Sequence, residues 1–175
     1  NTELIYSDSI GKDIYDLGFK TVLTEGARHI MGWRSPDYVY KNELKSGLKV
    51  LLRNYSLSDD IAFRFSNKEW SEWPLTAEKY VGWLKAAEGE IVNLFMDYET
   101  FGEHQGAECG IFDFMKALAD MVVQDPDLEF VTPSKAVTKH KAVDEISVPE
   151  PISWADEERD LSAWLGNELQ QDAYN

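Results

Sequence analysis

Hydrophobic and polar positions alternate between two periods along the chain. Short apolar runs rich in β-forming residues predict strands at residues 19–26, 48–55, 90–99 and 128–134, the last of which is stopped by Pro133. Apolar residues at helical spacing predict helices at residues 8–17, 77–87 and 111–123. Gly18 is placed to end the first helix and Thr76 to cap the second. Residues 61–65 fit either a strand or the start of a helix.

The order of these elements indicates the fold class. Strands and helices alternate, and the strands are continuous apolar runs, as expected when both faces of a parallel sheet are covered. No internal repeat, low-complexity segment or clear linker divides the chain of 175 residues. The sequence therefore predicts an α/β domain, or a piece of one, with a parallel sheet.

The C-terminal part follows a different pattern. Pro149 and Pro151 favour extended chain within residues 138–152. Ser153 opens the sequence SWAD, which has the form of a capping box. We expect a helix beyond Ser153 that buries an apolar stripe made of Leu161, Trp164, Leu165 and Leu169.

Charge and composition narrow the possible partners. With 17 basic and 32 acidic residues, the net charge is −15, which repels a phosphate polymer, and no basic stripe opposes it. Nucleic acid is therefore not expected as a partner, whereas a neutral sugar meets no such repulsion. No apolar run approaches the ~18 residues of a membrane-spanning helix, so no membrane association is expected. Cys109 is the only cysteine, which excludes an internal disulfide and favours a reducing, cytoplasmic compartment.

Polar and acidic residues gather where predicted strands end. Glu25 ends the first strand, Arg53 and Asn54 end the second, and Asp97 and Glu99 end the third. In β/α barrels such strand ends meet at one mouth, where the chemistry takes place. Two carboxylates facing each other there are what glycoside hydrolysis needs.

Six tryptophans are a high count for this length. Trp83 and Trp164 lie on helical stripes and are predicted to pack in the core. Trp33, Trp70 and Trp73 lie in polar, loop-like stretches, where stacking on a sugar and ordinary packing both remain open.

Three segments carry a family resemblance: TVLTEG (21–26), FMDYETFGEH (95–104) and SWADEERDLSAWLGNELQ (153–170). Together they resemble the α-amylases of glycoside hydrolase family 57. The resemblance implies a (β/α)7 barrel, a retaining mechanism and α-1,4-glucan or maltooligosaccharide substrates, with no cofactor and no metal. It makes Glu25 the nucleophile and Asp97 the general acid/base.

The resemblance also implies contacts around this pair. Glu99, Phe101, Gly102 and His104 match the rest of the signature and would support the site or touch the substrate. Residues 153–175 would lie as a helix near the barrel mouth, bringing Trp154, Asp160 or Trp164 to the pocket that contains Asp97.

One departure from the family concerns the beginning of the barrel. The family's first two signature regions, including a segment with a histidine, precede the glutamate region by a long stretch, but only 24 residues precede Glu25 here. We therefore expect residues 1–175 to be the C-terminal portion of an incomplete TIM-like barrel that lacks its N-terminal strands. The missing N-terminal part of the same barrel is then a partner.

Three alternatives stay open. A 4-α-glucanotransferase or a branching enzyme of the same family would use the same two carboxylates. A metal-dependent hydrolase would use Asp97, Glu99, His104 and His29 as ligands. The chain by itself would also fit an inactive fragment of an active parent.

Overall fold

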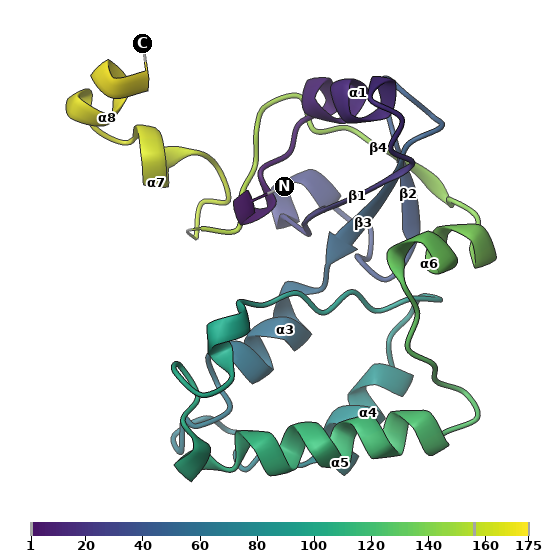
Figure 1. Ribbon diagram of the computed structural model, residues 1–175, viewed down its shortest axis with the longest axis vertical. Helices are drawn as coiled ribbons and strands as arrows, with labels where there is room; N and C mark the ends of the chain where they lie inside the picture. Colours follow the sequence, from purple (N-terminus) through teal and green to yellow (C-terminus); the bar gives the residue numbers. More distant parts are fainter. Residues whose placement is uncertain (1, 156, 175) are drawn as a thin grey trace.

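Four strands form one mixed sheet. The computed structural model describes residues 2–155 and 157–174. The strands are β1 (Thr21–Glu25), β2 (Val39–Asn42), β3 (Lys49–Arg53) and β4 (Asp144–Ile146), in the spatial order β1-β3-β2-β4 (Figure 1). β1 is parallel to β3 and β2 to β4, but β2 and β3 are antiparallel. The expectation of a purely parallel sheet is therefore wrong, because the short strand β2 enters beside β3 in the opposite direction.

The helices predicted at residues 8–17, 77–87 and 111–123 are present, and the first two begin after a capping side chain. The helices are α1 (Asp8–Asp16), α2 (Arg28–Met31), α3 (Tyr55–Ala62), α4 (Ala77–Lys85), α5 (Ile111–Gln124), α6 (Pro133–Lys139), α7 (Ser162–Leu165) and α8 (Glu168–Tyr174), with 3-10 turns η1 (Thr2–Leu4), η2 (Tyr98–Thr100) and η3 (Ala107–Cys109). Thr76 caps α4 by accepting the Lys79 N–H at 3.3 Å, and Gly18 follows α1 with a positive φ of 102°. Residues 61–65 contain the end of α3 rather than a strand. None of the described helices has the length and apolar character needed to cross a membrane.

Two of the predicted strands are extended chain without a strand ladder. Residues 90–97 make single backbone bonds to loops and strand ends, such as Asn54 N–H to Asn93 O at 2.9 Å and Ile91 N–H to Asp37 O at 3.1 Å. Residues 128–132 are likewise outside the sheet, and Pro133 begins α6 instead of ending a strand. The prediction of strands at residues 90–99 and 128–134 is therefore wrong, because an apolar pattern carries no information about which strand lies beside it.

The core is divided into three clusters. One face of the sheet packs under α1 through Val22, Tyr40, Val50 and Leu52. The other face packs against α6 through Leu51 and Ala136, with Leu23 partly buried there. The third cluster joins α3, α4 and α5, which lie together on the far side of residues 90–97 from the sheet (Figure 1).

The C-terminal prediction of one long packed helix is wrong. Residues 153–155 and 157–161 are not helical, and the helices that follow are the short α7 and α8, which lie apart from the sheet (Figure 1). No residue of either helix is buried, and the Leu169 side chain is 81% exposed. The first three residues of the SWAD sequence bend instead of starting a helix, with the Ser153 hydroxyl accepting the Ala155 N–H at 3.2 Å, and Asp156 lies outside the described residues.

Candidate functional site

Glu25 is a buried carboxylate at the end of β1. Its register partner in the parallel neighbour β3 is Arg53, and both are the last residues of their strands. Arg53 Nη1 donates a hydrogen bond to Glu25 Oε2 at 3.1 Å, and the Gly26 N–H donates to Oε1 at 2.7 Å. The Glu25 side chain is 0% exposed, so both oxygens are held in place within the protein.

Arg53 joins Glu25 to the segment that leads to Asp97. Its Nε donates to the Phe95 carbonyl oxygen at 2.7 Å, two residues before Asp97. Its Nη2 donates to the Asp59 carboxylate at the side of α3. One guanidinium therefore contacts β1, α3 and the extended segment 90–97 at once, which brings the two segments of the proposed acid pair together.

Two residues from the C-terminal part of the chain, Trp154 and Arg159, lie against Arg53 and Glu25. The Trp154 ring lies over the Arg53 guanidinium, 5.4 Å from ring centroid to Cζ, and its Nε1 donates to Glu3 at 2.9 Å. Arg159 Nε is 3.8 Å from Glu25 Oε2. Trp154 thus contacts the partner of Glu25, while its approach to the pocket of Asp97 stays a prediction.

The electrostatic state of Glu25 results from two opposing effects. Burial raises the pKa of the Glu25 carboxyl above its ordinary value. The guanidinium groups of Arg53 and Arg159 and the Gly26 N–H favour the carboxylate and lower that pKa again, with burial the larger effect. The Glu25 carboxylate has no access to water, and its ion pair with Arg53 therefore opposes its protonation.

This pKa shift makes stability depend on pH. Unfolded Glu25 releases its proton near pH ~4.3. The folded chain releases it at a higher pH, so in the window between the two values the folded state binds more protons. The free energy of unfolding contributed by Glu25 therefore falls as pH rises through this window. We expect Glu25→Gln to gain stability relative to the unchanged chain as the pH rises above ~4.3, measured by urea unfolding at each pH. Parallel stability curves for the two proteins would contradict this.

Gly26 is required by close packing between β1 and β3. A Cβ atom at this position would lie 2.3 Å from the Arg53 carbonyl oxygen, which is backbone and cannot swing away. We expect Gly26→Ala to destabilise the fold by roughly 1–3 kcal/mol, measured by chemical unfolding, because the ends of the two strands must separate. Gly82→Ala is a matched control, since nothing lies within 4 Å of a Cβ there. Equal effects of the two substitutions would count against the packing argument.

Asp97 lies at the start of a tight turn that faces solvent. The side chains of Asp97, Glu99 and His104 are exposed. The turn is closed by backbone bonds, including His104 N–H to Glu99 O at 3.0 Å, and is anchored by the buried Gln105 amide, which donates to Ala62 O at 2.9 Å. Phe101 is half-buried and packs against the helical cluster. The turn therefore presents carboxylates to solvent on a fixed base.

The predicted tryptophan contacts have different environments. Trp33 is 86% exposed, with the Arg34 guanidinium 5.2 Å from its ring, so its face is open for stacking. Trp70 packs edge-on against Trp83 at 6.1 Å in the helical cluster, and Trp83 belongs to the core as predicted. Trp73 is 43% exposed.

Asp160 and Trp164 lie on the C-terminal segment. The Asp160 carboxylate accepts the Ser162 N–H at 2.7 Å; a hydrogen bond from the Ser162 side chain, followed by this backbone bond, lowers the pKa of Asp160. Trp164 is 36% exposed, so the prediction that it is a core residue is wrong. Its apolar stripe does not pack because the helix that would carry the stripe is interrupted.

Metal ligands were a further possibility for four side chains. Within residues 2–155 and 157–174, no group of three or more His, Cys, Asp or Glu side chains is arranged to hold a metal ion. The candidates Asp97, Glu99, His104 and His29 do not form such a group in this part of the chain.

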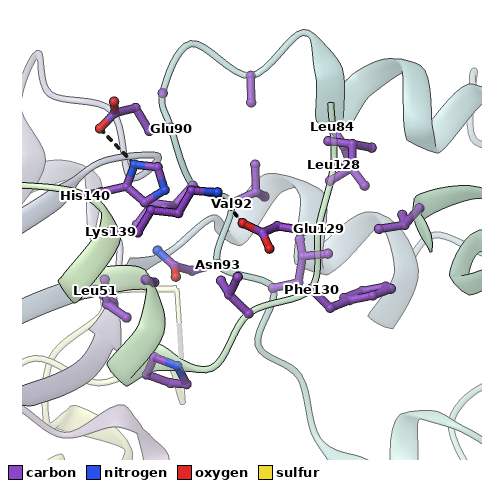
Figure 2. Close-up of a pocket in the computed structure, with 18 of the residues that line it drawn as sticks. Leu51, Leu84, Glu90, Val92, Asn93, Leu128, Glu129, Phe130, Lys139 and His140 are labelled. Carbon is purple, nitrogen blue, oxygen red and sulfur yellow. Dashed lines mark hydrogen bonds and ion pairs between the residues drawn. The ribbon is translucent and has the colours of Figure 1, made fainter. Parts of the chain in front are cut away.

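A large cleft opens beneath the sheet, next to the two extended segments. It has a volume of about 810 Å³ and is lined by Leu23 and Leu51 from the sheet, residues 89–95, and residues 127–131 (Figure 2). On its rim, His140 Nδ1 lies 3.3 Å from a Glu90 carboxylate oxygen, and Glu129 forms ion pairs with Lys135 and Lys139. These lysines lower the pKa of Glu129 to about 2. By strand alternation, Leu23 and Leu51 share a face with Glu25 and Arg53, so the cleft lies below the buried ion pair.

Comparison with known proteins identifies the family. The sequence profile of glycosyl hydrolase family 57 matches residues 1–149. The chain belongs to glycosyl hydrolase family 57. It is 53% identical over 173 residues to a Methanocaldococcus jannaschii protein named "Putative alpha-amylase", a match that covers 98% of this chain and 37% of that protein.

A solved structure has a similar fold over most of this chain. The crystal structure of the 4-alpha-glucanotransferase from Thermococcus litoralis superposes with a TM-score of 0.65 at 16% identity, covering 87% of this chain and 24% of that one. This family 57 chain thus shares a fold with about a quarter of a longer protein. It spans little more than a third of the curated relative that it matches.

Sequence reasoning found the ends of β1 and β3 but missed what surrounds them. Asp59 in α3, Arg159 in the C-terminal turn and Glu3 near the N-terminus were not singled out. The available signal was the charge pattern: Glu25 and Arg53 each end an apolar strand, and a buried pair of opposite charges is expected where such ends are neighbours.

Proposed function

We propose that this family 57 chain supplies the catalytic carboxylates of a retaining (β/α)7-barrel enzyme that acts on α-1,4-glucans. Glu25 attacks the anomeric carbon and forms a glycosyl-enzyme, while Asp97 protonates the leaving oxygen and then deprotonates the acceptor. The observation that carries this proposal is Arg53, which binds the Glu25 carboxylate and also the Phe95 carbonyl next to the Asp97 turn.

The different environments of the two carboxylates support their roles. Glu25 is buried against two arginines and a backbone N–H, which orient it and favour its ionised form against the effect of burial, as a nucleophile requires. Asp97 is exposed at the start of a turn, where it can exchange protons with substrate and water. In a retaining enzyme the two carboxyl groups are roughly 5–5.5 Å apart, which the completed barrel would have to provide.

The rest of the barrel is part of this proposal. Because the chain spans 37% of the Methanocaldococcus jannaschii protein, we propose that the remaining strands come from polypeptide outside these 175 residues. The chain alone would then bind little substrate and turn over none. Here "complete enzyme" means this chain joined to the rest of its barrel, for example by replacing the matching segment of that relative.

The substrate would lie across the mouth above Glu25. The open face of Trp33 and the ring of Trp154 offer stacking surfaces, and Glu99, His104 and Asp160 offer polar groups to sugar hydroxyls. Trp70 and Phe101 act mainly through packing, and Trp73 and Trp164 contribute at most to outer contacts. Water as the acceptor gives hydrolysis, and a second sugar gives transfer, so the ratio of free reducing ends to transfer products on maltooligosaccharides separates the two.

Chemical rescue tests the role of Asp97. We expect Asp97→Asn in the complete enzyme to lose activity on glucans by roughly 10²–10⁴-fold, because the leaving oxygen is no longer protonated. An α-glucosyl substrate with a good leaving group needs no such proton, so its first step should survive. Added azide should then release an α-glucosyl azide with retained configuration, detected by NMR. An inverted azide product from this variant would reverse the two assignments, and full activity on glucans would exclude Asp97.

A further inference from the structure

We propose that Arg53 is a positioning residue of this site, which fixes the orientation of Glu25 and the placement of the segment that carries Asp97. It is not proposed to touch substrate. This proposal rests on the function proposed above, because it concerns how the same two carboxylates are held.

The geometry of Arg53 supports a coupling role. Its three guanidinium nitrogens are directed to three separate elements: Nη1 to Glu25 at 3.1 Å, Nε to the Phe95 carbonyl at 2.7 Å, and Nη2 to Asp59. The side chain is 4% exposed and the Trp154 ring covers it. A planar cation that donates a hydrogen bond from each of its three nitrogens fixes direction as well as distance, which a flexible ammonium cannot do.

Few other contacts hold residues 90–97 in place. The described backbone bonds of this segment are separate contacts to Asn54 and Asp37, without a strand ladder. The Phe95 N–H donates to the Ser58 hydroxyl at 3.2 Å, so the same peptide region is held from both α3 and Arg53. Loss of Arg53 would remove the bond that ties the Phe95 carbonyl to the partner of Glu25 and would leave this peptide held from α3 alone.

The charged surroundings of Glu25 define what Arg53 contributes. The groups that act on this carboxylate are Arg53, Arg159 and, with opposite sign, Asp59. Arg53 is the closer of the two cations, at 3.1 Å against 3.8 Å for Arg159. Removing Arg53 leaves the buried Glu25 carboxylate with Arg159 as its cation, at the longer distance. The protonated form of Glu25 is then favoured relative to the carboxylate.

Titration of Glu25 in the 175-residue chain tests the electrostatic part. Carboxyl ¹³C NMR of the chain gives the Glu25 pKa directly, assigned by comparison with Glu25→Gln. We expect Arg53→Gln to raise this pKa by about 1–3 units, as for loss of an adjacent opposite charge, and Arg53→Lys to raise it less. Arg64→Gln is the matched control, because Arg64 also pairs with a partly buried carboxylate, Asp60, but does not face Glu25.

Kinetics of the complete enzyme test the positioning part. The acidic limb of kcat/KM should move to higher pH in Arg53→Gln by the shift seen in NMR. Arg53→Lys should keep most of the acidic limb but lose kcat, because one ammonium cannot also hold the Phe95 carbonyl. KM should change less than kcat in both variants, and Arg64→Gln should match the unchanged enzyme.

Each outcome has a defined meaning. An unchanged Glu25 pKa in Arg53→Gln, or full kcat in Arg53→Lys, overturns the proposal. If both Arg53 variants fail to fold while Arg64→Gln folds, Arg53 is structural only and the proposal is likewise overturned. Retained activity in Glu25→Gln would instead overturn the proposed function, whatever the Arg53 variants do, so the two failures are distinguishable.

Discussion

Glu25→Gln is expected to abolish turnover in the complete enzyme, with kcat falling on the order of 10⁴-fold or more. The amide keeps the size of the side chain, so packing at the end of β1 is retained, but it cannot attack the anomeric carbon. Both steps therefore fail: no glycosyl-enzyme forms, and nothing remains for the acceptor to displace. Release of reducing ends from maltooligosaccharides measures the loss.

Trapping the glycosyl-enzyme intermediate shows which residue forms the covalent bond to the sugar. A fluorinated α-glucosyl fluoride that forms a long-lived glycosyl-enzyme should add one sugar mass to the peptide that contains Glu25 in the unchanged enzyme, and none in Glu25→Gln. The matched control is Glu103→Gln, an exposed carboxylate in the Asp97 turn, which should label and turn over normally. A labelled peptide elsewhere, or undiminished activity of Glu25→Gln, would reject Glu25 as the nucleophile.

Tyr80→Ala is expected to cost about 3–5 kcal/mol of unfolding free energy, the largest stability effect among these predictions. Tyr80 lies in α4 at the centre of the helical cluster and is 0% exposed. Its ring meets Phe114 of α5 at 5.9 Å and Trp83 at 6.1 Å, and its hydroxyl donates to Leu57 O of α3 at 2.8 Å. One side chain therefore connects all three helices, and its removal leaves a cavity between them.

Two further substitutions separate the ring from the hydroxyl. Tyr80→Phe keeps the ring and should cost only about 1–3 kcal/mol, from the Leu57 carbonyl left without its donor. Phe19→Ala, at a position that is 62% exposed, should stay within about 0.5 kcal/mol. Urea unfolding of the 175-residue chain measures all three. A loss below about 1 kcal/mol for Tyr80→Ala would mean that the cluster does not limit stability.

The sequence predicted local structure well where a local signal exists. Thr76 marks the start of α4 because its side chain accepts an N–H within the next turn, which the sequence alone specifies. Glu25 and Arg53 were located correctly as strand ends because the switch from apolar to charged is also local.

Pairing and distant contacts were beyond the sequence pattern. Residues 90–97 have the composition of a strand, but a strand must also pair with a neighbouring strand. The pattern of hydrophobic residues does not specify that neighbour. β2 was missed for the reverse reason: four residues are too short to show a period, and it exists through its bonds to β3 and β4. The ion pair of Arg159 with Glu25 spans 134 positions and depends on the path of the C-terminal turn.

The few backbone bonds of residues 90–97 affect when the active site can form. Amide protons in this segment should exchange quickly with solvent in the isolated chain, unlike those of β1 and β3, which are paired with each other. Adding the other strands would slow that exchange by giving the segment neighbours on both sides. If the proposed function holds, catalytic competence would then appear only at the last step of assembly, and a partly folded enzyme would carry its acids without being able to cleave its substrate.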